Sequence, residues 1–208
     1  MMPRAGTSDT ETGMEPGPWL ILASASPRRA ELLQQAGFEF QVIPARVGEV
    51  EWDQLSPAEL CQLNAHRKAR AVAKQHPDAV VLGADTLVFL DRRILAKPGS
   101  AEEARQMLRA LSGRTHQVVT GVSLLHLRAH RETLFAVSTD VRFRSLKEGE
   151  ISRYLEAIDP LDKAGGYAIQ DHGEWIVEEI SGSFTNVVGL PLERVVAELV
   201  RFGLRPRQ

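Results

Sequence analysis

The stretch Leu20-Ile21-Leu22-Ala23-Ser24-Ala25-Ser26-Pro27-Arg28-Arg29 decides how the chain begins to fold. Three large apolar residues at 20–22 predict a buried strand. Ser26 followed by Pro27 predicts a helix start, because serine caps helix N-termini and proline suits the first helical position. The helix is expected to stop at Gly37. The sequence therefore predicts a strand that leads through a short polar turn into a helix.

This predicted helix start has the composition of an anion site. Free backbone N–H groups, the hydroxyls of Ser24 and Ser26 and the guanidinium groups of Arg28 and Arg29 would converge there. Such a group of donors favours phosphates above other anions. The same residues also suit an ordinary capped surface helix with two solvated arginines. Taken alone, the segment leaves both interpretations open.

The composition is that of an ordinary globular protein. The chain has 208 residues, of which 43% are hydrophobic and 25% are charged. Its net charge of −2 gives no overall basic field, so we expect no nucleic-acid partner. The single cysteine, Cys61, excludes an internal disulfide framework and a cysteine-based zinc site. It falls in a helical pattern, where we expect it to serve as a packing residue.

Residues 1–18 differ from the rest of the sequence. They are rich in Gly, Pro, Thr and Glu and lack the basic start and apolar core of a signal peptide. No later segment has the apolar length needed to span a membrane. We predict a disordered N-terminal extension over 1–18, a single domain over 19–208 and a cytoplasmic location.

Helical and β patterns alternate along the domain, which predicts an α/β fold with mixed strand directions. Helices are predicted after the cap residues Ser26, Ser56, Ser100 and Ser145 and from Pro191. Strands are predicted at 20–22, 38–44, 79–84, 86–90, 94–95, 117–127, 133–143 and 175–180. The glycines form neither a dinucleotide-binding fingerprint nor a Walker A loop.

Two carboxylates are candidates for chemistry. Asp85 follows the buried run 80–84, and ligands bind at strand ends in open α/β sheets. Glu49 lies in a polar loop, 47–51, and could join Asp85 around a hard divalent cation, which prefers oxygen ligands. The alternatives are a turn or cap aspartate and a solvated glutamate.

Two lysines are candidates for phosphate contacts. Lys68 lies in a predicted helix with Arg67 and Arg70, and one of these could point inward, although most helix lysines are solvated. Lys97 precedes Pro98, which favours an extended backbone from which the ammonium could reach a phosphate.

Two further segments are unusual for plain loops. The segment 159–170 combines small residues, which allow a ligand close to the backbone, with the polar groups of Asp162, Lys163 and Gln170. The segment 183–191 places an apolar loop before a helix start. Tight packing would explain both segments equally well.

The chain resembles the Maf family of nucleoside triphosphate pyrophosphatases over about residues 19–204. The resemblance is carried by Ser24-Ala25-Ser26-Pro27-Arg28-Arg29, Gly83-Ala84-Asp85-Thr86, Lys97-Pro98, Leu111-Ser112-Gly113, Asp162-Lys163-Ala164-Gly165-Gly166-Tyr167 and Val188-Gly189-Leu190-Pro191, in that order. It implies an elongated, ITPase-like α/β fold with a mixed sheet and two lobes around a central cleft. It also implies a homodimer, and hydrolysis of a nucleoside triphosphate to the monophosphate and pyrophosphate with a divalent metal.

Transferred to this sequence, the resemblance implies metal-assisted hydrolysis at the α-phosphorus. Asp85 would be the general base and a metal ligand, with Glu49 as a second ligand of Mg²⁺ or Mn²⁺. Lys68, Lys97 and Arg28 would neutralise the charge that develops on the phosphates. The family often has an acidic residue where this chain has Gly48, directly before Glu49.

The remaining implied roles concern substrate binding. Arg29, Ser24 and Ser26 would hold the triphosphate or the loop itself, and Asp162 and Lys163 belong to the same set of binding candidates. Thr86 and Gln170 would recognise the base.

Three positions favour one branch of the family. Arg28, Thr86 and Gln170 match the branch that prefers dTTP and UTP, whereas the 7-methyl-GTP branch typically has Trp, Gln and Glu there. A cationic methylated guanine suits a stacking Trp and a carboxylate, while a neutral pyrimidine suits an amide. The alternatives are a 7-methyl-GTP pyrophosphatase and a nucleotide-binding regulator of septum formation.

Overall fold

The structure, a computed structural model, describes residues 18–48, 50, 54–91 and 93–207. The strands are β1 (Leu20–Leu22), β2 (Phe40–Val42), β3 (Val80–Leu90), β4 (Arg93–Leu95), β5 (Thr115–His126), β6 (Arg131–Phe143) and β7 (Val177–Ser181). The helices are α1 (Pro27–Gln35), α2 (Pro57–Ala73), α3 (Ala101–Leu111), α4 (Glu148–Ala157), α5 (Gly173–Ile176), α6 (Phe184–Val188) and α7 (Leu192–Arg201), with a 3₁₀ turn η1 (Ala164–Gly166).

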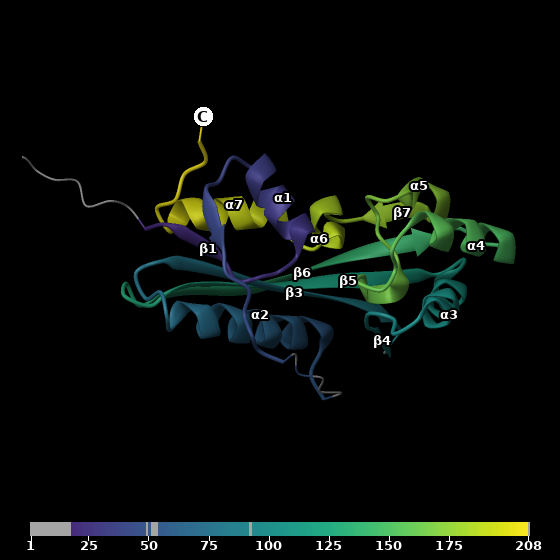
Figure 1. Cartoon of the computed structure of the whole chain (residues 1–208), viewed down its shortest axis with the longest axis horizontal. Helices are drawn as coiled ribbons and strands as arrows, with labels where there is room; N and C mark the ends of the chain where they lie inside the picture. Colours follow the sequence, from purple (N-terminus) through teal and green to yellow (C-terminus); the bar gives the residue numbers. More distant parts are fainter. Residues whose placement is uncertain (1–17, 49, 51–53, 92, 208) are drawn as a thin grey trace, which may run out of the picture.

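A mixed sheet runs along the length of the molecule (Figure 1). Its order is β2-β1-β3-β5-β6-β7, and β4 pairs with β3. β1 is parallel to β2 and to β3, whereas β3, β5, β6 and β7 pair antiparallel, as does β4 with β3. The predicted α/β class with mixed strand directions is therefore confirmed.

Several local predictions are wrong. The fourth cap is Lys147, whose backbone N–H binds Glu150, so α4 begins at Glu148 rather than directly after Ser145. The segment before β7 is the short helix α5 instead of strand, and α6 occupies most of the predicted loop 183–191. The predicted extension 1–18 lies outside the described residues except for Pro18.

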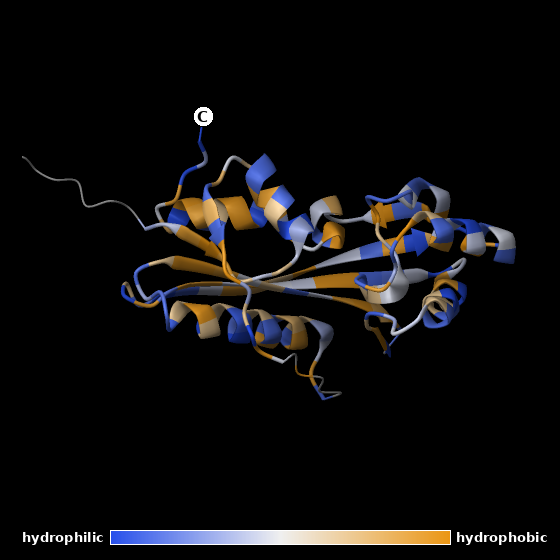
Figure 2. Cartoon of the chain, viewed as in Figure 1, coloured by the Kyte–Doolittle hydropathy of each residue, from blue (hydrophilic) through white to orange (hydrophobic). Residues whose placement is uncertain are grey.

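Helices cover both faces of the sheet. In Figure 1, α2 lies below the long strands and α1, α6 and α7 lie above them, while α3, α4 and α5 gather at the other end. Figure 2 shows the strands as largely apolar and the outer helix faces as hydrophilic. Among the described residues, two large apolar groups lie around Leu82, Leu124 and Leu199 and around Phe143 and Tyr154, and they are the cores of two lobes. Two smaller groups include residues of α2, one with Ala69 and Val81 and one with Cys61 and Phe89.

Two glycines set the distance between α2 and the sheet. A Cβ added at Gly83 would lie 2.3 Å from the carbonyl oxygen of Ala65, and one added at Gly121 would lie 2.2 Å from the carbonyl carbon of Cys61. Real Cβ atoms essentially never approach so closely, so only glycine permits this spacing. The helix backbone consequently packs directly against β3 and β5.

The edge of β3 is interrupted between the two lobes. β1 pairs with residues 80–82, and β4 pairs with 88–90. In the described part of the chain, no strand covers 83–87 on that edge. The functional candidates gather at this gap.

Candidate active site

Asp85 lies at the centre of the gap, opposite Gly121 in the middle of β3. The expected position at a strand end is wrong, because β3 continues without a break from Val80 to Leu90. Access to the carboxylate comes from the uncovered strand edge instead. The side chain is only 3% exposed, which makes a buried carboxylate that needs partners.

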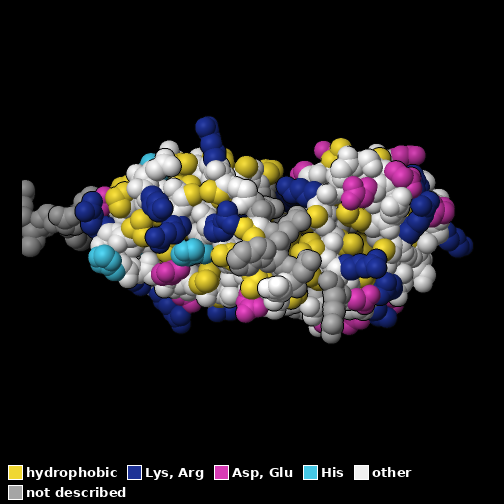
Figure 3. Space-filling model, turned by 90° about the horizontal axis from the view of Figure 1, so that it is seen from below, with side chains coloured by type: hydrophobic (Ala, Val, Ile, Leu, Met, Phe, Trp, Pro, Cys, Tyr) yellow, Lys and Arg dark blue, Asp and Glu magenta, His cyan; other side chains and the backbone are white. Residues whose placement is uncertain are grey.

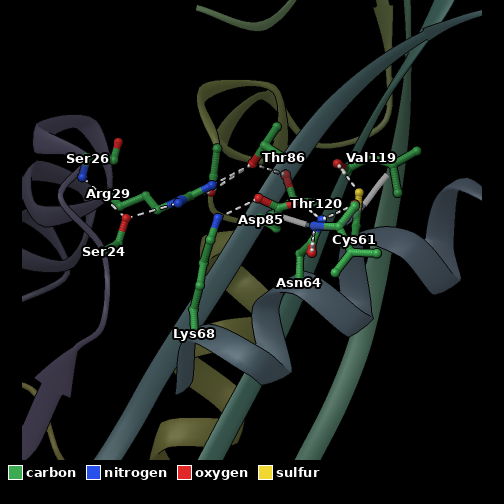
Figure 4. Close-up of polar contacts among 12 residues, drawn as sticks. Ser24, Ser26, Arg29, Cys61, Asn64, Lys68, Asp85, Thr86, Val119 and Thr120 are labelled. Carbon is green, nitrogen blue, oxygen red and sulfur yellow. Dashed lines mark hydrogen bonds and ion pairs between the residues drawn. The ribbon is translucent and has the colours of Figure 1, made fainter. Parts of the chain in front are cut away.

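The partners of Asp85 come from one face of α2 (Figure 4). Lys68 Nζ lies 2.6 Å from Asp85 Oδ1, and Asn64 Nδ2 donates to Asp85 Oδ2 at 3.2 Å. Residues 64 and 68 are one turn apart, so both reach the same carboxylate. Of the alternatives for Lys68, the inward orientation is therefore correct. Asn64 was not identified from the sequence. Its position four residues before Lys68, which places both side chains on one helix face, was the signal that could have found it.

Arg29 holds the turn before α1 in place by hydrogen bonds. It is buried, and its guanidinium donates to Gly189 O at 2.8 Å, to Ser24 Oγ at 3.0 Å and to Thr86 Oγ1 at 2.9 Å. Ser24 Oγ also accepts from the backbone N–H of Ser26 at 3.2 Å. Of the two roles considered for Arg29 and Ser24, the structure supports the one that holds the loop.

Thr86 is anchored on the sheet face opposite to that of Asp85. Besides Arg29, it contacts the hydroxyl of Thr120 at 3.0 Å, and Thr120 donates to Asn186 O at 3.1 Å. Thr120 and Asn186 are fully buried and were not identified from the sequence. Thr86 thus belongs to a fixed polar network that borders the cleft.

Arg28 reaches across the cleft to the other lobe. Its Nη1 lies 3.0 Å from Asp162 Oδ2, and Lys163 Nζ lies 2.7 Å from Asp162 Oδ1. Partial burial opposes ionisation of Asp162, but the hydrogen bond from Lys163 and the charge of Arg28 outweigh it and hold its pKa below the usual range. Lys163, which is buried, also donates to Asp159 O at 2.6 Å. The residues 28, 162 and 163 thus form one charged bridge between the lobes.

The cleft consists of two adjoining cavities, both open to solvent. The first combines Asp85, Thr86 and Asn64 with an apolar wall that includes Val88, Tyr167 and Ile169. The second, the cationic cavity, lies against the turn 23–29. Both are lined by Ser26, Arg28, Arg29, Lys68, Lys97 and Asp162. The first cavity thus combines an apolar wall with charged side chains, and it shares those charged side chains with the second.

The remaining candidates lie at different distances from this cleft. Lys97 is exposed, lines both cavities, and has no hydrogen bond or ion pair among the described residues. Ser26 occupies the N-cap position of α1 without a side-chain cap bond. Gln170 is exposed and follows the lining residues 167–169 without being one of them. Glu49 lies outside the described residues.

Cys61 is not a nucleophile in this site. Burial, reinforced by the charge of Asp85, raises the pKa of the Cys61 thiol to about 12, so the thiol stays protonated near neutral pH. Its Sγ contacts Val119 O at 3.3 Å, and the side chain is fully buried. The predicted packing role is confirmed.

A metal would need ligands beyond the described side chains. Among the described residues, no group of three or more His, Cys, Asp or Glu side chains is placed to hold a metal ion. Asp85 offers hard carboxylate oxygens in the cleft, which suit Mg²⁺ or Mn²⁺ when phosphate oxygens and water complete the set. The donor chemistry therefore fits a cation that arrives with its substrate.

On the face seen in Figure 3, basic side chains are interspersed with acidic and neutral ones. None of the described helices is both long and apolar enough to cross a membrane.

Comparison with known proteins identifies close relatives. A family described as Maf-like protein matches residues 19–202. The dTTP/UTP pyrophosphatase of Syntrophus aciditrophicus (strain SB) is 50% identical over 184 residues, covering 88% of this chain and 90% of that protein. The proteins of the same name from Akkermansia muciniphila and Bacillus pumilus are 48% and 46% identical, each match covering 90% of this chain and 98% of the relative.

A solved structure supports the fold independently. A HAM1 protein from Coxiella burnetii superposes with a TM-score of 0.51 at 17% identity, covering 88% of this chain and 99% of that one. At this identity the likeness concerns the fold alone. It agrees with the elongated two-lobed α/β architecture described above.

Proposed function

This chain belongs to the Maf family, and we propose that it hydrolyses dTTP and UTP to the monophosphate and pyrophosphate. The observation that carries the proposal is the buried Asp85 carboxylate, held by Lys68 in a cavity that has both an apolar wall and cationic side chains. A nucleotide needs both environments, one for its base and sugar and one for its phosphates. The proposal includes modified pyrimidine nucleotides as further substrates. Hydrolysis of such nucleotides would remove them from the nucleotide pool.

Asp85 acts in this proposal as the general base. Its carboxylate accepts a proton from water while the water oxygen attacks the α-phosphorus, and the bond to the bridging oxygen breaks to release pyrophosphate. Lys68 Nζ lies only 2.6 Å from Asp85 Oδ1 and holds the carboxylate by a charge-assisted hydrogen bond. Because Asp85 is buried, its carboxylate is held in the narrow range of orientations that proton transfer needs.

The cationic cavity stabilises the charge that the reaction moves. Arg28, Lys68 and Lys97 border it, and a leaving pyrophosphate gathers negative charge as the bond breaks. Lys97 has no hydrogen bond or ion pair among the described residues, so no such contact has to break when it binds a phosphate. Ser26, with its hydroxyl free of a capping bond, supplies a neutral donor beside them.

We propose Mg²⁺ or Mn²⁺ as the cofactor, held by Asp85 and Glu49 together with phosphate oxygens. When bound, such a cation polarises the phosphoryl group and offsets its charge. Base recognition is assigned to Thr86 and Gln170. The anchoring of Thr86 by Arg29 supports a rigid contact there.

Two further statements belong to the proposal. We place the protein in the cytoplasm, where nucleoside triphosphates occur, and we expect a homodimer, as the family resemblance implies. Size-exclusion chromatography with light scattering measures the second directly. A monomer at micromolar concentration would contradict it.

The test is pyrophosphate release from dTTP, UTP, CTP and 7-methyl-GTP, each with Mg²⁺ and with Mn²⁺. We expect dTTP and UTP to give the highest kcat/KM. Preference for 7-methyl-GTP would support the alternative branch. Nucleotide binding without any pyrophosphate release would support a regulator of septum formation.

A matched pair of variants tests the base. Asp85→Asn should lower kcat by roughly 10²–10⁴-fold and leave nucleotide binding largely intact. Asp91→Asn, an exposed change in the turn after β3, serves as the control and should retain activity. Equal activity of both variants would remove Asp85 from the mechanism.

A further inference from the structure

Asn64 is a buried polar side chain to which no catalytic role has been assigned. It is 2% exposed and lies on α2 one turn before Lys68. Its amide Nδ2 donates to Asp85 Oδ2 at 3.2 Å and to Val50 O at 3.1 Å, and its Oδ1 accepts from Val50 N at 2.9 Å. Every hydrogen-bonding group of the carboxamide is thus used, which is costly to replace.

The contact with Val50 has the pattern of a strand pairing. One carboxamide meets both the N–H and the C=O of the same residue, so the backbone there is fixed in distance and orientation. Val50 lines the same cavity as Asp85. The side chain of Asn64 therefore joins a wall of the cleft to the carboxylate at its centre.

The carboxylate of Asp85 is held at both oxygens. Lys68 occupies Oδ1 and Asn64 occupies Oδ2, and the close packing of α2 against Gly83 makes both contacts possible. A carboxylate held at one oxygen alone can rotate about its Cβ–Cγ bond, because that torsion is soft. The second contact removes this freedom.

We propose that Asn64 is a positioning residue that fixes the plane of the Asp85 carboxylate and ties it to the cleft wall at Val50. This inference rests on the proposed function, since it assigns to Asn64 an action through the base. A carboxamide side chain at position 64 suits this role better than a carboxylate or an aliphatic group. Aspartate would place a second negative charge beside Asp85, and an aliphatic residue would leave three polar groups without a partner.

The experiment measures kcat and KM for dTTP in Asn64→Ala and Asn64→Asp, each alone and combined with Asp85→Asn. Arg67→Ala, an exposed change on the same helix, is the matched control. We expect a loss of about 10–100-fold in kcat for both Asn64 variants, typical of groups that orient an active-site ligand. KM should change by no more than about twofold to threefold, because substrate contacts stay in place.

The combined variants decide whether Asn64 acts through Asp85. If it does, Asn64→Ala should change the residual single-turnover rate of Asp85→Asn by less than about twofold. The same fold-loss in both backgrounds would overturn the proposal, as would a rise in KM with unchanged kcat. A merely structural role predicts additive losses.

Hydrogen exchange at the Val50 amide tests the contact between Asn64 and Val50 without an activity assay. Protection should be present in the wild type, lost in Asn64→Ala and kept in Asn64→Asp, which retains an acceptor at the same place. Unprotected Val50 in the wild type would overturn the proposal. If the Val50 amide is protected in the wild type but the protein releases no pyrophosphate, the proposed function fails while the contact between Asn64 and Val50 is confirmed. Asn64→Asp is nearly isosteric, so it remains informative if the alanine variant does not fold.

Discussion

The spacing of α2 from the sheet can be changed by one methyl group. In Gly83→Ala the new Cβ would lie 2.3 Å from Ala65 O, 2.7 Å from Ala69 N and 2.9 Å from Ala69 Cβ. All three neighbours belong to the helix, and two of them are backbone atoms, so no side chain can rotate away. The helix must withdraw by about 1 Å to reach ordinary contact.

A withdrawal of that size affects both stability and catalysis. Overpacking of a buried contact costs about 1–3 kcal/mol of unfolding free energy. The contacts of Lys68 and Asn64 with Asp85, now 2.6 and 3.2 Å, span this same interface between α2 and β3 and would be strained by the shift. Misplacement by about 1 Å near reacting groups costs on the order of 10²-fold in rate. We therefore expect a kcat about 100-fold lower in a protein that is still folded at 25 °C.

The assay pairs urea unfolding with pyrophosphate release. Gly149→Ala provides the control, because a Cβ there meets nothing within 4 Å and alanine favours the helix α4 by about 0.5–1 kcal/mol. That variant should keep its kcat and gain stability. Wild-type kcat and stability in Gly83→Ala would refute the claim that this glycine sets the geometry of the site.

Three further perturbations have distinct outcomes. The triple change Arg28→Trp, Thr86→Gln and Gln170→Glu should abolish dTTP and UTP turnover, because unpaired buried groups cost about 1–3 kcal/mol each; a folded variant that still prefers dTTP would exclude these positions from base recognition. Lys97→Ala should lower kcat/KM strongly, and wild-type kinetics at ordinary ionic strength would exclude its phosphate contact. Burial lowers the pKa of His116 to about 4, so the unfolded chain alone binds this proton as pH falls below about 6.5. The unfolding free energy should therefore drop by up to about 3 kcal/mol between pH 7 and pH 4, a slope that urea titrations should find reduced in His116→Asn.

Local signals predicted the elements that depend on local chemistry. The cap residues Ser56 and Ser100 mark the starts of α2 and α3, and both accept the expected backbone hydrogen bond. Ser145 is not the cap, because Lys147 occupies the N-cap position and its backbone N–H donates to the carboxylate of Glu150. Which of several nearby residues becomes the N-cap depends on where the preceding strand ends. A short sequence motif does not contain that information.

The polar pair at the centre of β3 could not be placed from sequence. Asp85 and Thr86 look like a break in an apolar run, because unpaired polar groups are excluded from buried strands. They are tolerated since opposite faces of the sheet supply their partners, Lys68 on one side and Arg29 on the other. Those partners are 17 and 57 positions away. Only the folded chain brings them together.

Adjacent arginines also took different roles for a geometric reason. Successive residues of a helix point about 100° apart, so Arg28 and Arg29 cannot face the same way. Arg29 turns into the protein towards Gly189, and Arg28 turns into the cleft towards Asp162. Sequence analysis identified both as anion candidates but could not orient the helix.

The strands β3, β5 and β6 pass through both lobes as one hydrogen-bonded ladder. A hinge requires a few residues that absorb large changes in φ and ψ, and a paired strand cannot supply them without losing its ladder. The ladder therefore opposes a hinge motion within these strands, and twisting of the sheet is the deformation that it allows between the lobes. The separation of the lobes is thus set by the sheet before a nucleotide arrives.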